Sequence, residues 1–211
     1  MSPLGTSNSS GARRHQYDAE TFAKMRTNVG QPIFGVDVKI TDDDNEELPW
    51  DGVAFGALKV SGPWICSSYF KLDGSSAHEE DGWFETGDVA TIDSRGNVSI
   101  TDRTKDVIKS GGEWISSIEI ENCATGHPQV AEAAVIGRNH PKWGERPLLI
   151  IVKSGGDDVA PDELKGYLDG KIAKWWMPDD VQFIDEMPHT ATGKIQKMKL
   201  REMFDNYQFP A

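Results

Sequence analysis

The sequence predicts an α+β protein in two parts, a short β-rich first part and a small α+β domain after it. Three observations lead to this prediction. Up to about residue 101, short stretches of alternating polar and apolar residues are separated by turn-forming residues, as in antiparallel strands. After residue 102, helix-capping residues precede apolar stretches of helical length. The pattern changes within 102–105 (DRTK), so we expect domains at 1–102 and 103–211.

The expected elements of the first part are short. A helix is predicted over 18–26, and strands are predicted over 36–41, 57–61, 89–93 and 98–101. The glycine- and serine-rich stretch 5–12 is expected to be a loop. The acidic segment 42–47 (DDDNEE) is expected to be a solvated hairpin turn, because its spacing is not that of a calcium-binding EF-hand loop. The composition of 93–97 (DSRGN) indicates a second hairpin turn.

The second part mixes helices and strands. Ser116 or Ser117 can cap a helix over 118–125, which Gly126 ends. Pro161 suits the first turn of a helix that continues over 162–173. The remaining expected elements are strands over 130–136, 148–152 and 181–184 and a final amphipathic helix over 197–207.

Composition excludes several classes of protein. The net charge of −12 argues against a sequence-independent nucleic-acid binder and against adhesion to an anionic membrane by charge. No apolar run is long enough for a transmembrane segment, and 1–14 lacks the apolar stretch of a signal peptide. The isolated Cys66 and Cys123 fit a reducing compartment and no zinc site. We therefore expect a cytoplasmic protein, and peripheral association with a membrane stays open.

Two residues near the domain boundary have side chains suited to a nucleotide. Asp88 ends the segment 82–88 (GWFETGD), and its carboxylate can accept hydrogen bonds from two vicinal hydroxyls such as those of a ribose. Gly87 would let the backbone approach a ligand. The planar fork of Arg103 suits a ribose or phosphate oxygen. Taken alone, Asp88 is more often a turn residue, and Arg103 could equally form a salt bridge between domains.

The segment 102–114 (DRTKDVIKSGGEW) contains a glycine pair, Gly111 and Gly112. The pair is too short for a phosphate-binding glycine loop, and no dinucleotide fingerprint surrounds it. Two glycines would instead let the backbone approach a narrow ligand. Without further context, Lys109 is a solvated lysine and Trp114 is a core aromatic residue.

Lys194 follows a glycine in the segment 190–197 (TATGKIQK). The segment resembles the end of a Walker A motif, but the first glycine is missing and Ile195 replaces the serine or threonine that would bind magnesium. A lysine after a glycine turn can still point its ammonium into a cleft, although a plain loop lysine is the commoner case. No Ser/His/Asp or Cys/His triad is visible.

In this order and spacing, the three segments resemble the adenylate-forming (AMP-binding) enzyme superfamily. The stretch 110–117 (SGGEWISS) resembles its medium- and long-chain fatty acyl-CoA synthetase branch. The resemblance runs from about Met1 to Phe204 and covers the last third or so of such an enzyme. It implies a reaction of a fatty acid with ATP and CoA, through an acyl-adenylate, to acyl-CoA, AMP and pyrophosphate. It also implies Mg²⁺, whose ligand would lie outside this chain.

The resemblance implies a role for each candidate residue. Lys194 would be catalytic and would stabilise charge on the α-phosphate during adenylation. Lys105 would be both a nucleotide contact and the hinge about which the C-terminal domain rotates between the two half-reactions. The other implied nucleotide contacts are Asp88, Arg103, Lys109 and Trp114, while Gly111 and Gly112 would line the path of the CoA pantetheine arm. His189 stands where relatives often carry arginine, which weakens any phosphate contact there.

The resemblance further implies that 1–102 is the trailing part of a large adenylation domain and 103–211 a mobile C-terminal domain. The phosphate loop and the acyl pocket would then lie outside the chain, so we expect no activity from the chain alone and no signature of acyl chain length. Unpartnered strand edges in the first part would favour a homodimer. Two alternatives remain: a non-catalytic nucleotide-binding or assembly fragment, and an adenylate-forming enzyme with a different acceptor.

Overall fold

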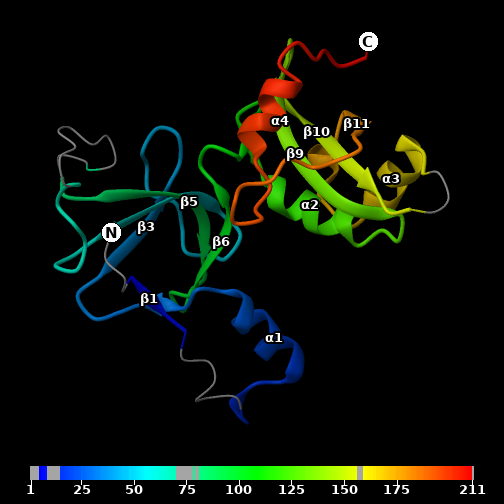
Figure 1. Cartoon of the computed structure of the whole chain (residues 1–211). Coiled ribbons are helices and arrows are strands. Elements are labelled where there is room, and N and C mark those ends of the chain that lie inside the picture. Colours follow the sequence, from blue (N-terminus) through cyan, green and yellow to red (C-terminus); the bar gives the residue numbers. More distant parts are fainter. Residues whose placement is uncertain (1–4, 9–14, 70–77, 79–80, 156–158, 211) are drawn as a thin grey trace. The chain divides into compact units, whose positions relative to one another are not determined.

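The protein divides into two compact units, Met1–Lys105 and Asp106–Ala211, in a computed structural model (Figure 1). The structure describes residues 5–8, 15–69, 78, 81–155 and 159–210. The first unit consists mainly of antiparallel strands, and the second combines a mixed sheet with short helices. The α+β class predicted from the sequence is therefore confirmed.

The first unit is built on a four-stranded antiparallel sheet. Its strands follow the chain order, β3 (Asp37–Thr41), β4 (Phe55–Ser61), β5 (Phe84–Ile92) and β6 (Val98–Arg103). Alternate residues turn to one face, where Val36, Val38 and Ile40 pack with apolar residues of the other three strands. A two-stranded ribbon of β1 (Thr6–Ser7) and β2 (Gln31–Pro32) and the helix α1 (Ala19–Thr27) complete the unit.

Local hydrogen bonds explain three elements that the sequence predicted in this unit. Asp18 caps α1, because its carboxylate accepts the backbone N–H of Thr21 at 2.8 Å. The acidic turn is closed by Asp42, whose carboxylate accepts two backbone N–H groups further along the turn. Asp93 closes the 93–97 turn in the same way. The expected loop at 5–12 is only partly described, and it contains the short strand β1.

The second unit is a five-stranded sheet between helices. The long antiparallel pair β9 (Val130–His140) and β10 (Gly144–Lys153) forms its centre, and β11 (Asp180–Phe183) runs parallel to β10. The short strands β7 (Ile108–Ser110) and β8 (Glu113–Ile115) form a hairpin that joins β10 at Gly144. Leu148, Leu149, Ile150 and Ile151 are fully buried, so β10 is covered on both faces.

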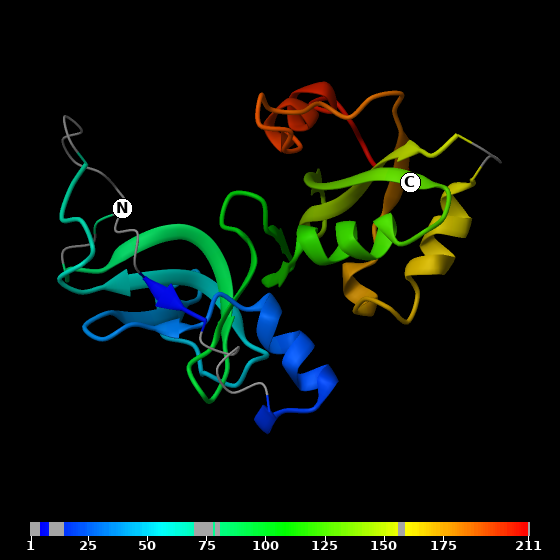
Figure 2. The ribbon, with the colours of Figure 1, turned by 60° about the horizontal axis from the view of Figure 1, so that its bottom comes forward.

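Helices cover the two faces of this sheet. The helix α2 (Ser117–Thr125) runs alongside β9, and α4 (Lys197–Met203) lies on the opposite side, as Figure 2 shows. Ser116 caps α2 through a 3.2 Å hydrogen bond from the N–H of Glu119, and Gly126 ends it as predicted. The helix α3 (Pro161–Leu168) begins at its proline, and the 3₁₀ helix η2 (Lys174–Trp176) follows.

Two predicted helices are shorter in the structure. The prediction of a helix to residue 173 was wrong, because α3 ends at Leu168 and Gly170 adopts a φ of +75° that a right-handed helix does not allow. The final helix ends at Met203 and not at 207. Beyond it, Phe204, Tyr207 and Phe209 pack against the apolar sheet face that carries Ile136 and Leu148. The chain leaves the helix after Met203, because packing of these aromatic rings on the sheet stabilises it more than further helical turns would.

Polar contacts also hold the segment after α4 to the sheet, and Arg138 of β9 donates to the Asp205 carbonyl. The Tyr207 hydroxyl donates a hydrogen bond to the Asp180 carboxylate. Burial and this carboxylate raise the pKa of the Tyr207 hydroxyl above its ordinary value. The pKa of Asp180 is lowered, because hydrogen bonds from Tyr207 and Gln182 outweigh the opposing effect of burial.

Tyr207→Phe is expected to lower the free energy of unfolding by about 1–3 kcal/mol, as for a lost hydrogen bond to a charged group. The raised pKa of Tyr207 means that its contribution is present below the ordinary value of 10.0 and is lost as pH rises through the raised value. The contribution of Asp180, whose pKa is lowered, is lost as pH falls. Urea unfolding at acidic, neutral and alkaline pH tests this. The variant should lose stability less steeply than the wild type at alkaline pH, and identical pH dependence would refute the assignment.

Candidate functional site

The first unit places Asp88 and Arg103 side by side. They are paired residues of β5 and β6, and an Asp88 oxygen lies 2.8 Å from the Arg103 guanidinium. Gly87 has a φ of +76°, and its carbonyl accepts the N–H of Thr104 at 3.0 Å. The Thr86 hydroxyl accepts the backbone N–H of Asp88 at 3.1 Å. The local backbone thus fixes the carboxylate at the end of β6.

The two side chains differ in their exposure. The Asp88 side chain is 23% exposed and that of Arg103 is 55% exposed, so the carboxylate lies deeper than its partner. Burial raises the pKa of the Asp88 carboxyl, and the nearby Arg103 charge partly offsets this increase. The salt bridge of Arg103 is therefore formed within the first unit. A half-exposed arginine beside a carboxylate can also bind a hydroxyl or phosphate oxygen of a ligand.

Lys105 is the last residue of the first unit. It is exposed and lies in the turn that follows β6. The next residue, Asp106, is buried in the second unit, where its carboxylate lies 2.8 Å from Arg201 of α4. Lys105 is thus an exposed turn residue at the end of one unit, and the residue after it is anchored in the other unit. A residue in such a position can absorb a backbone rotation without breaking core packing.

The second unit brings Lys109 and Trp114 together on the β7–β8 hairpin. They are directly opposed in the register, and the Lys109 ammonium lies 5.1 Å from the centroid of the Trp114 ring. Gly111 and Gly112 form the two-residue turn with φ values of +59° and +88°. Positive φ at both positions is the signature of a type I′ hairpin turn. The sequence contained this signal, a glycine pair between two β-prone triplets, and our prediction missed the hairpin.

A loop between β9 and β10 covers this turn. The Gly111 N–H donates to the Trp143 carbonyl at 2.8 Å, and the Lys109 N–H donates to the Glu145 carboxylate at 3.0 Å. A Cβ atom on Gly111 would lie 2.9 Å from the ring of Trp143, whereas one on Gly112 would meet nothing within 4 Å. Gly111 is therefore required by packing as well as by backbone conformation. Trp143 and Glu145 are site residues that sequence reasoning assigned no function.

Gly111→Ala is expected to destabilise the second unit by about 2–3 kcal/mol, from left-handed backbone strain together with overpacking against Trp143. Gly112→Ala is the matched comparison, because it meets only the backbone strain and should cost about 1–2 kcal/mol. Urea unfolding of the two variants measures the difference. Equal losses of stability would show that the Trp143 ring moves aside for the added Cβ atom at no cost in free energy.

The Lys194 segment forms a short hairpin loop between β11 and α4. The Thr190 N–H donates to the Lys194 carbonyl at 2.8 Å, and the Gly193 N–H donates to the Thr190 carbonyl at 2.9 Å. Gly193 has a φ of +79°, as expected where a three-residue loop ends in a glycine bulge. Lys194 is exposed, and its ammonium forms no ion pair with any residue that the structure describes. The loop therefore holds its backbone and presents a free cation.

Two ion pairs fix the ends of this loop. His189 lies 2.8 Å from the Glu132 carboxylate, which gives this histidine a structural partner in place of a phosphate. Lys197 lies 2.7 Å from the Glu121 carboxylate and donates to the Ser117 hydroxyl at 2.6 Å. The Glu121 and Lys197 side chains are 15% and 12% exposed, so this pair anchors α4 to α2 in a partly desolvated environment.

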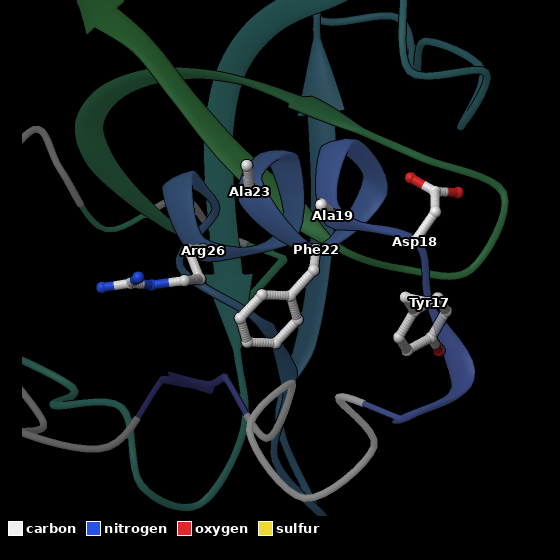
Figure 3. Close-up of a pocket in the computed structure, with 6 residues that line it drawn as sticks. All are labelled: Tyr17, Asp18, Ala19, Phe22, Ala23 and Arg26. Carbon is white, nitrogen blue, oxygen red and sulfur yellow. The ribbon is translucent and has the colours of Figure 1, made fainter.

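A hollow of about 510 Å³ lies beside α1 in the first unit (Figure 3). Its lining comprises Tyr17, Asp18, Ala19, Phe22, Ala23 and Arg26. The Asp18 carboxylate is engaged in capping α1, and none of the predicted site residues lines the hollow. We assign no ligand to it.

Within the described ranges, no group of three or more histidine, cysteine, aspartate or glutamate side chains could hold a metal ion. No helix in that same part of the chain has the length and apolar character needed to cross a membrane.

Comparison with known proteins defines the class of the second unit. The sequence profile of the AMP-binding enzyme C-terminal domain matches residues 119–194, which include the Lys194 loop. Residues 119–194 therefore match the C-terminal domain of AMP-binding enzymes, as the resemblance of the chain's segments indicated.

The particular relatives are CoA ligases. The chain is 55% identical over 204 residues to 3-methylmercaptopropionyl-CoA ligase of Ruegeria lacuscaerulensis, a match that covers 97% of this chain and 38% of the relative. It is 46% identical over 204 residues to medium-chain-fatty-acid–CoA ligase of Ectopseudomonas oleovorans, covering 97% and 37%. ATP-bound MatB from Rhodopseudomonas palustris superposes with a TM-score of 0.74 at 35% identity, covering 86% of this chain and 37% of that protein. The chain thus spans less than two-fifths of the length of these relatives.

Proposed function

We propose that this chain is the C-terminal portion of an ATP-dependent acyl-CoA synthetase. Such an enzyme forms an acyl-adenylate from a carboxylic acid and ATP, and then transfers the acyl group to CoA. The observation that carries the proposal is the match to CoA ligases over 97% of the chain, which includes all the candidate residues from Asp88 to Lys194. The domain assignment is part of the same proposal, with 1–102 as the trailing part of a large adenylation domain and 103–211 as the mobile domain.

The residues on each unit fit parts of ATP. The Asp88 carboxylate can accept hydrogen bonds from the ribose hydroxyls, and a Cβ built on Gly87 meets nothing within 4 Å, so a ligand can approach the backbone there. Arg103 lies 2.8 Å from that carboxylate, and Lys105, two residues further along the chain, supplies a second positive charge. In the second unit, Lys109 and Trp114 present a cation and an aromatic face for the nucleotide. Lys194 supplies a cation for the α-phosphate.

The roles of the hinge and of CoA belong to the same proposal. Lys105 is the residue about which the second unit would rotate between half-reactions. Gly111 and Gly112 would line the path of the pantetheine arm, because neither residue has a side chain and a Cβ atom on Gly112 would meet nothing within 4 Å. Mg²⁺ would be held by residues outside this chain. The alternative of a non-catalytic binding or assembly fragment predicts no role for Lys194, and a homodimer through the first unit is compatible with either case.

Two substrate classes are supported by different observations. The segment 110–117 (SGGEWISS) and the similarity to a medium-chain-fatty-acid–CoA ligase favour a fatty acid. The higher identity to 3-methylmercaptopropionyl-CoA ligase favours a short sulfur-containing acid. The acyl pocket would lie outside the chain, so the identity of the acid would depend on residues that this chain does not contain. The curated CoA-ligase relatives favour CoA as the acceptor.

The proposal is tested with a fusion enzyme, in which this chain replaces the corresponding part of the Ruegeria ligase. Acid-dependent exchange of labelled pyrophosphate into ATP reports adenylation, and the acid is the host's own substrate. We expect exchange by the fusion and none by the 211-residue chain alone, because the proposal places the phosphate loop, the Mg²⁺ ligand and the acyl pocket outside the chain. Exchange by the isolated chain above a no-protein control would contradict the assignment as one portion of a larger active site.

A further inference from the structure

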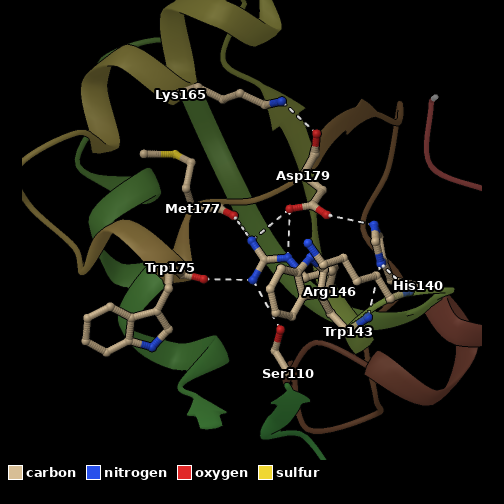
Figure 4. A network of polar contacts seen from close by, with 9 residues as sticks. Ser110, His140, Trp143, Arg146, Lys165, Trp175, Met177 and Asp179 are labelled. Carbon is tan, nitrogen blue, oxygen red and sulfur yellow. Dashed lines mark hydrogen bonds and ion pairs between the residues drawn. The ribbon is translucent and has the colours of Figure 1, made fainter. Parts of the chain in front are cut away.

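Arg146, at the start of β10, lies at the centre of a polar network that reaches three segments of the second unit (Figure 4). Its Nε and Nη2 lie 2.8 Å from Oδ1 of Asp179. Nη1 donates to the Trp175 carbonyl at 2.8 Å and to the Ser110 hydroxyl at 3.2 Å, and Nη2 donates to the Met177 carbonyl at 2.9 Å. A guanidinium has five N–H donors, and four of them form hydrogen bonds here, while the Asp179 carboxylate also lies beside Nη2.

Through these hydrogen bonds, Arg146 links two segments of the second unit. On one side it binds Ser110, the residue before the Gly111–Gly112 turn. On the other side it binds the stretch 175–179, which Lys165 also contacts by donating to the Asp179 carbonyl at 2.7 Å. The Arg146 side chain is only 13% exposed, so its charge is held by these contacts and not by bulk water.

The neighbours of Arg146 contact the same turn. Gly144 pairs with Ser110, Trp143 accepts the Gly111 N–H, and Glu145 accepts the Lys109 N–H. Four consecutive residues, 143–146, therefore contact three consecutive residues, 109–111. Arg146 is the residue among 143–146 that also binds the Asp179 carboxylate. The network sets the position of the glycine turn relative to the 175–179 segment.

We propose that Arg146 is a positioning residue for the glycine turn and that the thiol-transfer step depends on it more than adenylation does. The inference rests on the proposed function, in which Gly111 and Gly112 line the path of CoA. Lysine cannot replace this arginine, because an ammonium has at most three donors and no planar fork.

The first test uses the 211-residue chain and needs no activity. Arg146→Met should increase amide hydrogen exchange at Gly111 about tenfold or more while the β9 amides keep their protection. Arg138→Met is the matched control. Arg138 is directly opposite Arg146 in the register and its side chain is also 13% exposed, but it contacts the Arg201 and Asp205 carbonyls. It should leave exchange at Gly111 within about twofold of the wild type, because its contacts are with α4 and the segment after it and not with the glycine turn.

The second test uses the fusion enzyme. Arg146→Met should raise the KM for CoA about tenfold and leave pyrophosphate exchange within about twofold, the split expected when an interaction serves one half-reaction. Equal losses in both half-reactions, or unchanged exchange at Gly111, would overturn the inference. If Arg146→Met loses protection in β9, Ser110→Ala decides the question, because it removes only the acceptor next to the turn. A wild-type fusion without pyrophosphate exchange would contradict the proposed function, and the exchange at Gly111 would still decide the positioning role.

Discussion

Lys194→Ala in the fusion enzyme is expected to slow adenylation by about 10²–10³-fold, the usual effect of removing one preorganised group that stabilises developing charge. The structure supports this size of effect in two ways. The loop backbone is fixed by the Thr190 and Gly193 hydrogen bonds, and the ammonium has no competing ion pair among the described residues. The backbone that carries the lysine is thus fixed, and its ammonium is available. Pyrophosphate exchange measures the adenylation step.

The same variant should form acyl-CoA from supplied acyl-adenylate at a rate close to that of the wild type. Lys199→Ala is the matched control, because Lys199 is another exposed lysine five residues further on, in α4. It should leave both steps unchanged. A Lys194→Ala enzyme that loses both half-reactions equally would show that the lysine supports the fold or binding in general and not the chemistry of adenylation.

Lys105→Pro should have the opposite effect and slow thioester formation much more than adenylation. Proline fixes φ and restricts the preceding residue, and an incompatible backbone conformation costs about 3 kcal/mol. If that cost falls on only one of two domain orientations, the step that needs it slows about 10²-fold. Rates of acyl-CoA formation from supplied acyl-adenylate, compared with pyrophosphate exchange, measure the split.

Lys105→Ala separates the hinge from the charge. It removes the ammonium and leaves φ free, so thioester formation should fall much less than in the proline variant. A large and equal loss in both variants would indicate that the ammonium itself is needed. Normal thioester formation by Lys105→Pro would remove the hinge role from this position.

The elements with strong local signals could be predicted from the sequence. Asp18 and Ser116 cap helices at the expected positions, and Asp93 closes a turn that the composition of 93–97 predicted. These elements depend on hydrogen bonds between residues four or fewer positions apart. The ends of helices were less predictable. The final helix stops at Met203 because Tyr207 and Phe209 pack on the sheet, a contact between residues far apart in the chain.

The candidate site shows the same division. Resemblance to a family identified Asp88, Lys109 and Lys194, but it said nothing of what holds them in place. The ion pair between Asp88 and Arg103 comes from the register of β5 and β6, and that between His189 and Glu132 joins distant segments. The role of Arg146 depends on acceptors at 110, 175, 177 and 179, which no spacing in the sequence brings together.

The most direct test of the central claim is the rate of acyl-CoA formation by the fusion enzyme from acid, ATP and CoA. The comparison is the host large domain without any C-terminal portion. If this chain supplies the catalytic lysine and the CoA path, the fusion should exceed the large domain alone by about 10²-fold or more, at least the effect of one positioned charge. A folded fusion that forms no more acyl-CoA than the large domain alone would contradict the assignment.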